Sequence, residues 1–146
     1  MNHLLGRGSF ASVFLGRQIS NDAPAAVKVI DKRIFANQYN LKNIYCEIDI
    51  MKKMEHENIV RFMDVYQTSN NMYIITEYCP DGDLRGYLKK RKRLPEQEAI
   101  NFLKDILRGF EYMSKRDIMH RDLKPANILV SNGKLKISDF GFARNL

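Results

Sequence analysis

The chain is poor in cysteine and has no long apolar run, and both shortages exclude classes of protein. Its 146 residues include two cysteines, Cys46 and Cys79, which lie far apart and lack the spacing of metal ligands. Two cysteines are also too few for the disulfide framework of a small secreted domain, so we expect a reducing, intracellular setting. No segment approaches the roughly 20 apolar residues that a membrane helix needs, and the N-terminal residues lack the apolar core of a signal peptide.

What remains is the composition of an ordinary soluble domain. Hydrophobic residues make up 45% of the chain and charged residues 28%, which is enough to build one core. Twenty-four Lys and Arg against 17 Asp and Glu give a formal charge of +7. This excess permits an anionic partner such as a nucleotide, an acidic protein or a nucleic acid, without choosing among them.

The hydrophobic pattern predicts strands first and helices later. Strands are expected over 10–17 and 24–31, joined by a polar turn, and again over 60–66 and 72–78. Between the two pairs, apolar residues at helical spacing predict an amphipathic helix over 41–54. We therefore expect a small antiparallel sheet with one helix in the first half of the chain.

The second half is predicted to be mainly helical. Asp83 can cap a short helix, and Pro95 sits early in a long helix that runs to about Ser114. Two short strands, 128–130 and 135–137, then flank an Asn-Gly turn. The predicted fold class is thus α+β. The apolar stripe expected to bury the long helix consists of Ile100, Leu103, Ile106, Leu107 and Phe110.

A glycine-rich stretch near the N-terminus is the first candidate site. In Gly6-Arg7-Gly8-Ser9 the missing side chains let backbone N–H groups approach phosphate oxygens. A strand follows the glycines, which excludes a Rossmann site, and no Gly-Lys-Ser/Thr closes the loop, which excludes a Walker A loop. A plain hairpin turn stays open as an alternative for this stretch alone.

Lys28 is the second candidate, because it places one ammonium group in an otherwise apolar strand. A strand lysine is usually just solvated. Glu47, beside the apolar stripe of the following helix, can pair with Lys28 and hold it toward the α and β phosphates of a nucleotide. Taken alone, Glu47 is equally well a surface residue.

The densest group of ionisable residues lies in His120-Arg121-Asp122-Leu123-Lys124-Pro125-Ala126-Asn127. Asp122 is placed to accept the proton of an attacking hydroxyl group, and Lys124 can neutralise charge on a transferred phosphoryl group. Asn127, five residues after Asp122, offers a neutral oxygen ligand to magnesium. A polar turn with an incidental aspartate fits this spacing poorly.

Asp139, at the end of the last predicted strand, precedes Phe140 and Gly141. The tripeptide means little alone, but Asp139 follows Asn127 by twelve residues and can supply the second hard-oxygen ligand to magnesium. These candidates together predict a magnesium site that binds a triphosphate.

The order of these features along the chain resembles the eukaryotic protein kinase family. That family also has a glycine-rich stretch, then a strand lysine, a helix glutamate, a catalytic loop and Asp-Phe-Gly. Lys124-Pro125-Ala126-Asn127 looks like the serine/threonine class, which transfers phosphate from ATP to protein Ser or Thr hydroxyls. The resemblance implies a Lys28–Glu47 ion pair, catalysis by Asp122, and magnesium held by Asn127 and Asp139.

The same resemblance implies where the nucleotide lies. Glu77 to Cys79 match the hinge whose backbone binds the adenine, Thr76 matches the gatekeeper position that precedes it, and Asp83 falls near the ribose. The residues that would sandwich the adenine are Val13, Ala26 and Leu129. The side chains that stack to align the two lobes of an active kinase are matched by Met51, Met72, His120 and Phe140.

Three stretches, 56–60, 77–84 and 139–146, are similar to the autophagy-initiating ULK-type kinases. Calcium/calmodulin-dependent kinases share part of the third stretch. The finer resemblance implies a role in autophagy initiation, with cytoplasmic location and recruitment to autophagy-related membranes.

The sequence departs from the kinase pattern in two places. The third loop glycine is Ala11, a replacement that such kinases commonly tolerate. The chain also ends at Leu146, five residues after Gly141, so we expect a partial kinase domain. Its small lobe would cover 1–78, and the hinge and start of the large lobe 79–146. A truncated, non-catalytic fragment that binds nucleotide or competes for a kinase's partners therefore stays open as a second hypothesis.

The basic run Lys89-Lys90-Arg91-Lys92-Arg93 lies between the two helices of the second half. Because no aromatic residues interleave with it, we expect a solvated loop and no nucleic-acid partner. An acidic docking partner or peripheral contact with an anionic membrane stays open for this run.

Overall fold

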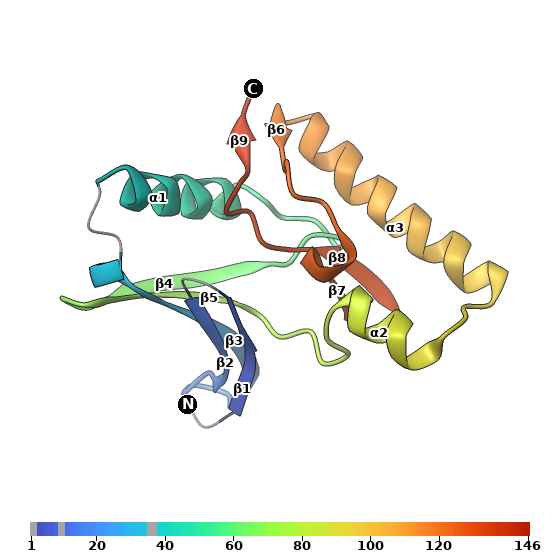
Figure 1. Cartoon of the computed structure of the whole chain (residues 1–146), viewed down its shortest axis with the longest axis horizontal. Coiled ribbons are helices and arrows are strands. Elements are labelled where there is room, and N and C mark those ends of the chain that lie inside the picture. Colours follow the sequence, from blue (N-terminus) through green and yellow to red (C-terminus); the bar gives the residue numbers. More distant parts are fainter. Residues whose placement is uncertain (1–2, 9–10, 35–37) are drawn as a thin grey trace.

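The computed structural model of the chain describes residues 3–8, 11–34 and 38–146, with the side chains of all of these except residues 34 and 38–41. A five-stranded sheet and helix α1 (Gln38–Lys52) form one side of the molecule, and helices α2 (Leu84–Arg91) and α3 (Glu96–Ser114) lie on the other (Figure 1). The predicted α+β fold class is confirmed.

The larger sheet has the strand order β1-β2-β3-β5-β4, with every neighbouring pair antiparallel. Its strands are β1 (His3–Arg7), β2 (Ala11–Arg17), β3 (Pro24–Asp31), β4 (Phe62–Gln67) and β5 (Asn71–Glu77). The four predicted strands are present, β3 with the predicted bounds and the other three with shifted ends, and β1 is an addition. A short 3-10 turn, η1 (Lys32–Ile34), leads away from β3.

Helix α1 packs its apolar stripe into the core between the helix and this sheet. Ile44, Ile48 and Met51 are buried together with Met72 and Ile74 of β5. The helix is predicted over 41–54 but begins at Gln38 and ends at Lys52. Residue 54 is buried after the helix end, where the backbone turns. The helical spacing that predicted this helix is confirmed at Ile44, Ile48 and Met51, and the side chain of Leu41, which belongs to the same predicted stripe, lies outside the described residues.

Helix α2 begins where the sequence predicts a cap. The Asp83 carboxylate Oδ1 accepts a hydrogen bond from the Gly86 backbone N–H at 2.7 Å. This bond satisfies one of the backbone donors that the first turn of a helix leaves free. Helix α3 follows, with Pro95 at its N-cap position.

The predicted apolar stripe of α3 is not the face that packs. Leu103, Leu107 and Phe110 are 56%, 55% and 54% exposed. The face of α3 that is buried contains polar and small residues among its apolar ones. Hydrophobic periodicity therefore selected the other face, which has more apolar residues but is exposed. Ile100 is exposed as well, and Ile106 is half-buried against the second core cluster. The buried face consists of Phe102, Asp105, Gly109 and Met113.

Two contacts explain why Asp105 and Gly109 occupy that buried face. Asp105 Oδ2 accepts a hydrogen bond from the backbone N–H of Leu135 at 3.0 Å, which ties α3 to the strand that contains Leu135. A Cβ at Gly109 would lie 2.8 Å from Ile137 Cδ1 and 2.9 Å from the Asn58 backbone oxygen. The helix can approach this closely only because residue 109 has no side chain.

The rest of the chain forms two small two-stranded sheets. One pairs β7 (Ile128–Ser131) with β8 (Lys134–Ile137), and Asn132 and Gly133 at its turn both have positive φ. This hairpin is confirmed as predicted. The other pairs β6 (Ile118–Met119) with β9 (Arg144–Asn145), and both strands are additions to the predicted set. A 3-10 turn, η2 (Pro125–Asn127), precedes β7.

One isolated backbone bridge joins the segment before β4 to the second half of the chain. Ile59 bridges to Ile137 through two bonds of 2.9 Å, from Val60 N to Ile137 O and from Ile137 N to Asn58 O. A second isolated bridge, between Asp83 and Leu129, lies within the second half. None of the helices in the described part of the chain combines the length and apolar character that crossing a bilayer takes.

Candidate active site

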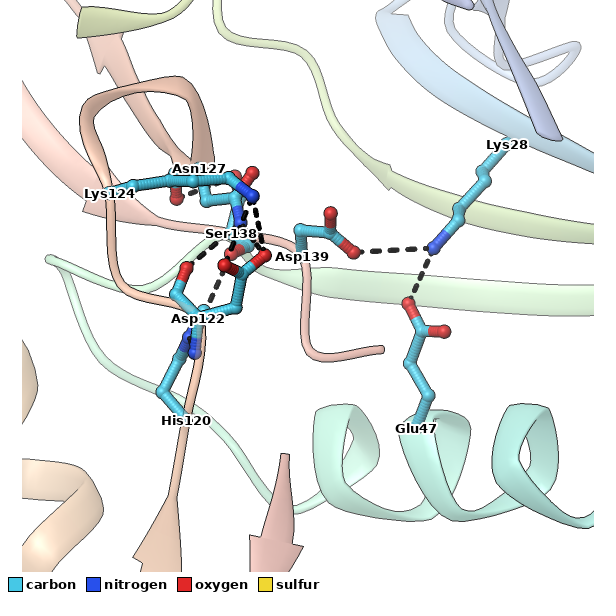
Figure 2. Close-up of polar contacts among 8 residues, drawn as sticks. All are labelled: Lys28, Glu47, His120, Asp122, Lys124, Asn127, Ser138 and Asp139. Atoms are coloured by element: carbon cyan, nitrogen blue, oxygen red, sulfur yellow. Dashed lines mark hydrogen bonds and ion pairs between the residues drawn. The ribbon is translucent and has the colours of Figure 1, made fainter. Parts of the chain in front are cut away.

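Lys28 of β3 lies between two carboxylates that come from different elements. Its Nζ is 2.6 Å from Glu47 Oε1 on α1 and 3.6 Å from Asp139 Oδ1, which follows β8 (Figure 2). Alternation along β3 puts Lys28 on the face toward α1, and Glu47 is buried beside the apolar stripe of that helix. The predicted Lys28–Glu47 ion pair is present in the structure.

This environment keeps Lys28 charged. Burial alone would lower the pKa of Lys28, but the charges of Glu47 and Asp139, together with their hydrogen bonds, outweigh burial and raise the pKa. A fixed cation with a side chain still 27% exposed can meet an anionic group at the mouth of the site.

The loop between β6 and β7 gathers three of the predicted residues. Lys124 Nζ lies 3.0 Å and 2.8 Å from the two carboxylate oxygens of Asp122. Asn127 Nδ2 donates to Asp122 Oδ2 at 2.8 Å and to the Asp122 backbone oxygen at 2.9 Å. The hydrogen bond from Lys124 is the largest cause that lowers the pKa of Asp122, partial burial opposes it, and the bond from Asn127 adds to the lowering. Asp122 is therefore an ionised carboxylate with a fixed orientation.

Asp139 lies between the Lys28–Glu47 pair and the Asp122 loop (Figure 2). Its backbone has φ of 61°, a conformation that a non-glycine residue adopts at some cost in energy. Its side chain is 48% exposed. The surrounding fold thus holds a strained aspartate with its carboxylate between Lys28 and the Asp122 loop, a space that we call the cleft (Figure 2).

The donor set here fits magnesium. Both hydrogens of the Asn127 amide are engaged by Asp122, so its oxygen is left as an acceptor, and Asp139 adds a carboxylate. Mg²⁺ prefers such oxygen ligands and is usually held by one or two carboxylates plus substrate phosphates and water. Within 3–8, 11–34 and 38–146, no three His, Cys, Asp or Glu side chains converge as a metal cluster.

One face of the sheet carries four of the residues predicted to contact the nucleotide. Residues directly opposite each other in an antiparallel pair share a face. Val13 is opposite Lys28, and Ala26 is opposite Thr76. These side chains are half-buried, as is Leu129 on β7, beside the bridge to Asp83. Sequence reasoning predicted all of them, and the register brings Val13, Lys28, Ala26 and Thr76 onto one surface.

The glycine-rich stretch forms the end of the β1–β2 hairpin. Gly6 and Arg7 belong to β1, and Gly8 N donates to Ala11 O at 2.8 Å, which closes the turn. Ser9, also predicted to contact the nucleotide, lies outside the described residues.

The predicted hinge, Glu77 to Cys79, begins with the last residue of β5. The side chain of Glu77 accepts hydrogen bonds from the Arg61 N–H at 2.7 Å and from Lys136 Nζ at 2.9 Å, so it is engaged with β8 and not with the cleft. Cys79 is buried, and burial, assisted by the charge of Glu77, raises the pKa of its thiol to about 11. The Asp83 carboxylate is occupied in part by its helix cap.

The four side chains expected to stack across the lobes are all buried. Met51, Met72, His120 and Phe140 are at most 6% exposed. The rings of His120 and Phe140 meet edge to face with centroids 5.2 Å apart. His120 Nε2 also lies 2.9 Å from the Ser138 backbone oxygen.

Ser138 is a residue of the site that sequence reasoning missed. Its backbone N–H and its Oγ both donate to the Asn127 backbone oxygen, at 2.9 Å and 3.0 Å. These bonds hold Ser138, and with it the neighbouring Asp139, at a fixed distance from the loop that contains Asp122. A lone serine before Asp-Phe-Gly offered no signal in the sequence.

A comparison with models of protein families identifies the family of this chain. A family model described as the protein kinase domain matches residues 1–146, the whole chain. The chain belongs to the protein kinase family. Kinases named as serine/threonine-protein kinases are similar to it over nearly its entire length.

Three relatives illustrate the range of kinases that this kinase chain resembles. It is 38% identical to serine/threonine-protein kinase ATG1a of Arabidopsis thaliana, over 97% of the chain and 23% of that protein. It is 41% identical to serine/threonine-protein kinase ULK1 of Homo sapiens, over 98% of the chain and 14% of the relative. It is 42% identical to the cell cycle serine/threonine-protein kinase CDC5/MSD2 of Saccharomyces cerevisiae, over 97% of the chain and 20% of the relative. The kinase chain thus spans less than a quarter of the length of these relatives.

Proposed function

We propose that the chain transfers the γ-phosphoryl group of ATP to Ser or Thr hydroxyls of protein substrates. The observation that carries this proposal is the position of Lys28, paired with Glu47 and 3.6 Å from Asp139, across the cleft from an Asp122 oriented by Asn127 and Lys124. A cation and an oriented, ionised carboxylate on opposite sides of one cleft suit positioning and electrostatic catalysis.

Each residue has a separate task in this reaction. Lys28 binds the α and β phosphates, while Glu47 keeps its ammonium group in place. Asp122 orients the acceptor hydroxyl and takes its proton as the oxygen bonds to the γ-phosphorus. The bond from the γ-phosphorus to the bridging oxygen breaks, and ADP leaves. Lys124 offsets negative charge on the transferred group.

Asn127 and Asp139 are the proposed magnesium ligands. The chemistry that magnesium supplies when bound is neutralisation of phosphate charge. The adenine is proposed to lie against Val13, Ala26 and Leu129, with backbone bonds from 77–79 and the ribose near Asp83. The loop that includes Gly6, Arg7, Gly8 and Ser9 would cover the phosphates. In this proposal residues 1–78 form the small lobe, and 79–146 the hinge and part of the large lobe.

The proposal is tested by phosphotransfer from γ-labelled ATP to peptide libraries with a fixed acceptor. We expect label on serine and threonine libraries, none on a tyrosine library, and loss of transfer when EDTA removes magnesium. Label on tyrosine alone would overturn the assignment to the Ser/Thr class. If no library is labelled, the proposed kinase activity of the chain is overturned.

A second candidate is a nucleotide-binding chain that competes for a kinase's partners without catalysis. The exposed apolar residues Leu103, Leu107 and Phe110 on α3 favour it, since such a surface is usually covered by protein. A rise in melting temperature with Mg²⁺-ATP, without transfer in the assay above, is the outcome that supports this candidate.

The similarity to ATG1a and ULK1 supports the further proposal that the protein acts in autophagy initiation, in the cytoplasm and on autophagy-related membranes. Relatives such as CDC5/MSD2 are equally similar over this region, so the pathway needs its own test. Deleting the gene should block starvation-induced autophagic flux, and re-expression of an Asp122→Asn form should not restore it. Normal flux after deletion would contradict the pathway proposal while leaving the kinase proposal intact.

A further inference from the structure

The segment after Gly141 contacts the helix that carries Glu47. Arg144 of β9 donates from Nη2 to Asn43 Oδ1 on α1 at 2.6 Å, although the two residues are 101 positions apart. Asn43 and Glu47 are four residues apart, so they lie on one face of α1 and one turn from each other. A Cβ at Gly141 would lie 3.5 Å from Glu47 Oε2. One short segment therefore meets two successive turns of α1.

Backbone bonds attach the same segment to the catalytic loop. Met119 pairs with Arg144 in the β6–β9 ladder, and Met119 directly precedes the loop that begins at His120. Arg121 Nε donates to the Phe142 backbone oxygen at 2.7 Å. Figure 1 shows β9 beside β6, between α1 and α3. Any movement of β9 is therefore shared by the loop that carries Asp122.

The Arg144–Asn43 bond bridges these two attachments. Both residues are half-buried, and a guanidinium donor makes the bond charge-assisted, which strengthens it relative to a neutral bond. Among the ion pairs of the described residues, none involves Arg144; its second contact is with the oxygen of its neighbour Ala143. Arg144 thus connects the catalytic loop, through β9, to the helix face that presents Glu47.

We propose that Arg144 is a positioning residue, which through Asn43 fixes α1 relative to the catalytic loop so that Glu47 reaches Lys28. The inference rests on the proposed function, because its kinetic consequence exists only in an active kinase. Without the bond between Arg144 and Asn43, the residues Lys28, Glu47 and Asp122 are still present. Their positions relative to one another are then no longer fixed. Turnover then falls, since the phosphates and the acceptor are no longer aligned.

The test compares Arg144→Ala, Asn43→Ala and Asn43→Asp in the protein as its native reading frame encodes it. We expect Arg144→Ala to lower kcat about tenfold, with a smaller change in KM for ATP. Asn43→Ala should do the same, the double variant should lose no more than either one, and Asn43→Asp should retain activity because its carboxylate accepts the same bond. The matched control is Arg17→Ala, which removes an arginine that pairs with Asp22 at the far hairpin.

Two further measurements separate positioning from general stability. In a Glu47→Gln background, Arg144→Ala should not lower kcat further, because Arg144 is proposed to act through Glu47, which is already changed. If Arg144→Ala lowers kcat by the same factor in that background as in the wild type, the proposal is overturned. Hydrogen exchange of the α1 backbone should also speed up in Arg144→Ala but not in Arg17→Ala. This second readout needs no activity. If the wild-type protein transfers no phosphate, the proposed function fails, and unchanged exchange in α1 would overturn the link separately.

Discussion

Asn127 donates to Asp122 twice from one amide nitrogen, to the carboxylate Oδ2 at 2.8 Å and to the backbone oxygen at 2.9 Å (Figure 2). Both amide hydrogens are engaged, so the two bonds orient the side chains of Asp122 and Asn127 together. A carboxylate proposed to take a proton and an amide oxygen proposed to bind a cation therefore share one geometric constraint. Changing either residue should disturb the other.

Asp122→Asn should greatly reduce transfer while preserving the fold. The substitution keeps the shape and an acceptor oxygen but removes the charge, so we expect a loss of about 100- to 10,000-fold in kcat, the range for a general base. The rise in melting temperature that Mg²⁺-ATP produces should stay near that of the wild type, although the variant itself melts somewhat lower because the ionised Asp122 stabilises the native state. The matched control is Asp117→Asn, an exposed aspartate in the same region with φ of 55°. Transfer at more than a tenth of the wild-type rate would contradict the role of Asp122.

Lys28→Met should affect both activity and stability. The carboxylate of Glu47 would then be buried without its cation, at a cost of about 1–3 kcal/mol in the free energy of unfolding. Denaturant unfolding would measure this cost, with the exposed Lys104→Met as control. Adding Glu47→Leu should recover stability but not transfer. A double variant as unstable as the single one would argue against an unpaired charge as the cause.

Acid unfolding should report the contact between Lys124 and Asp122. Because folding lowers the pKa of Asp122, its ionised form stabilises the native state above about pH 4, the unfolded value. That stabilisation is lost as the pH falls through the lower folded value. Lys124→Met removes the largest cause of the lowering, so the midpoint of acid unfolding by circular dichroism should move to higher pH. In an Asp122→Asn background the same change should shift nothing, and an equal shift there would exclude Asp122 as the source.

Gly109→Ala should destabilise the protein although alanine favours helices. The added methyl group meets the Asn58 backbone oxygen and Ile137, and overpacking of this kind costs about 1–3 kcal/mol. The control is Gly86→Ala in α2, where the nearest atom would be 3.6 Å away. That change should be neutral or stabilising by about 0.5–1 kcal/mol. Chemical denaturation of both variants decides the matter, and equal stabilities would refute the close approach of α3.

The sequence predicted those parts of the site that lie close together along the chain or on periodic elements. Asp122, Lys124 and Asn127 share one loop, so their spacing alone suggested joint chemistry. Lys28 and Glu47 could be paired in advance because an apolar strand and an amphipathic helix limit where each side chain points. The strands and helices came from the same periodicity, with errors mainly at their ends.

What could not be predicted depends on contacts between distant residues. The packed face of α3 contains Asp105 and Gly109, which are favourable only because Leu135 and Asn58 lie opposite them. Strands β6 and β9 have two residues each, too few for any periodicity to appear. The bond from Arg144 to Asn43 joins residues whose neighbourhood no local pattern reveals.

One backbone bridge and the chain connection itself restrict how the cleft between the halves can open. Ile59 pairs with Ile137 across the halves, and the chain passes from one half to the other at 78–79, shortly before Asp83, which is held to Leu129 within the second half. A sliding motion between the halves would break the Ile59–Ile137 bridge, whereas a rotation about the line from this bridge to the 78–79 connection would keep it. We therefore expect the cleft to open by swinging about this axis. The glycine-rich hairpin, which belongs to the strands at the far edge of the sheet, would move farther than the residues that hold the adenine.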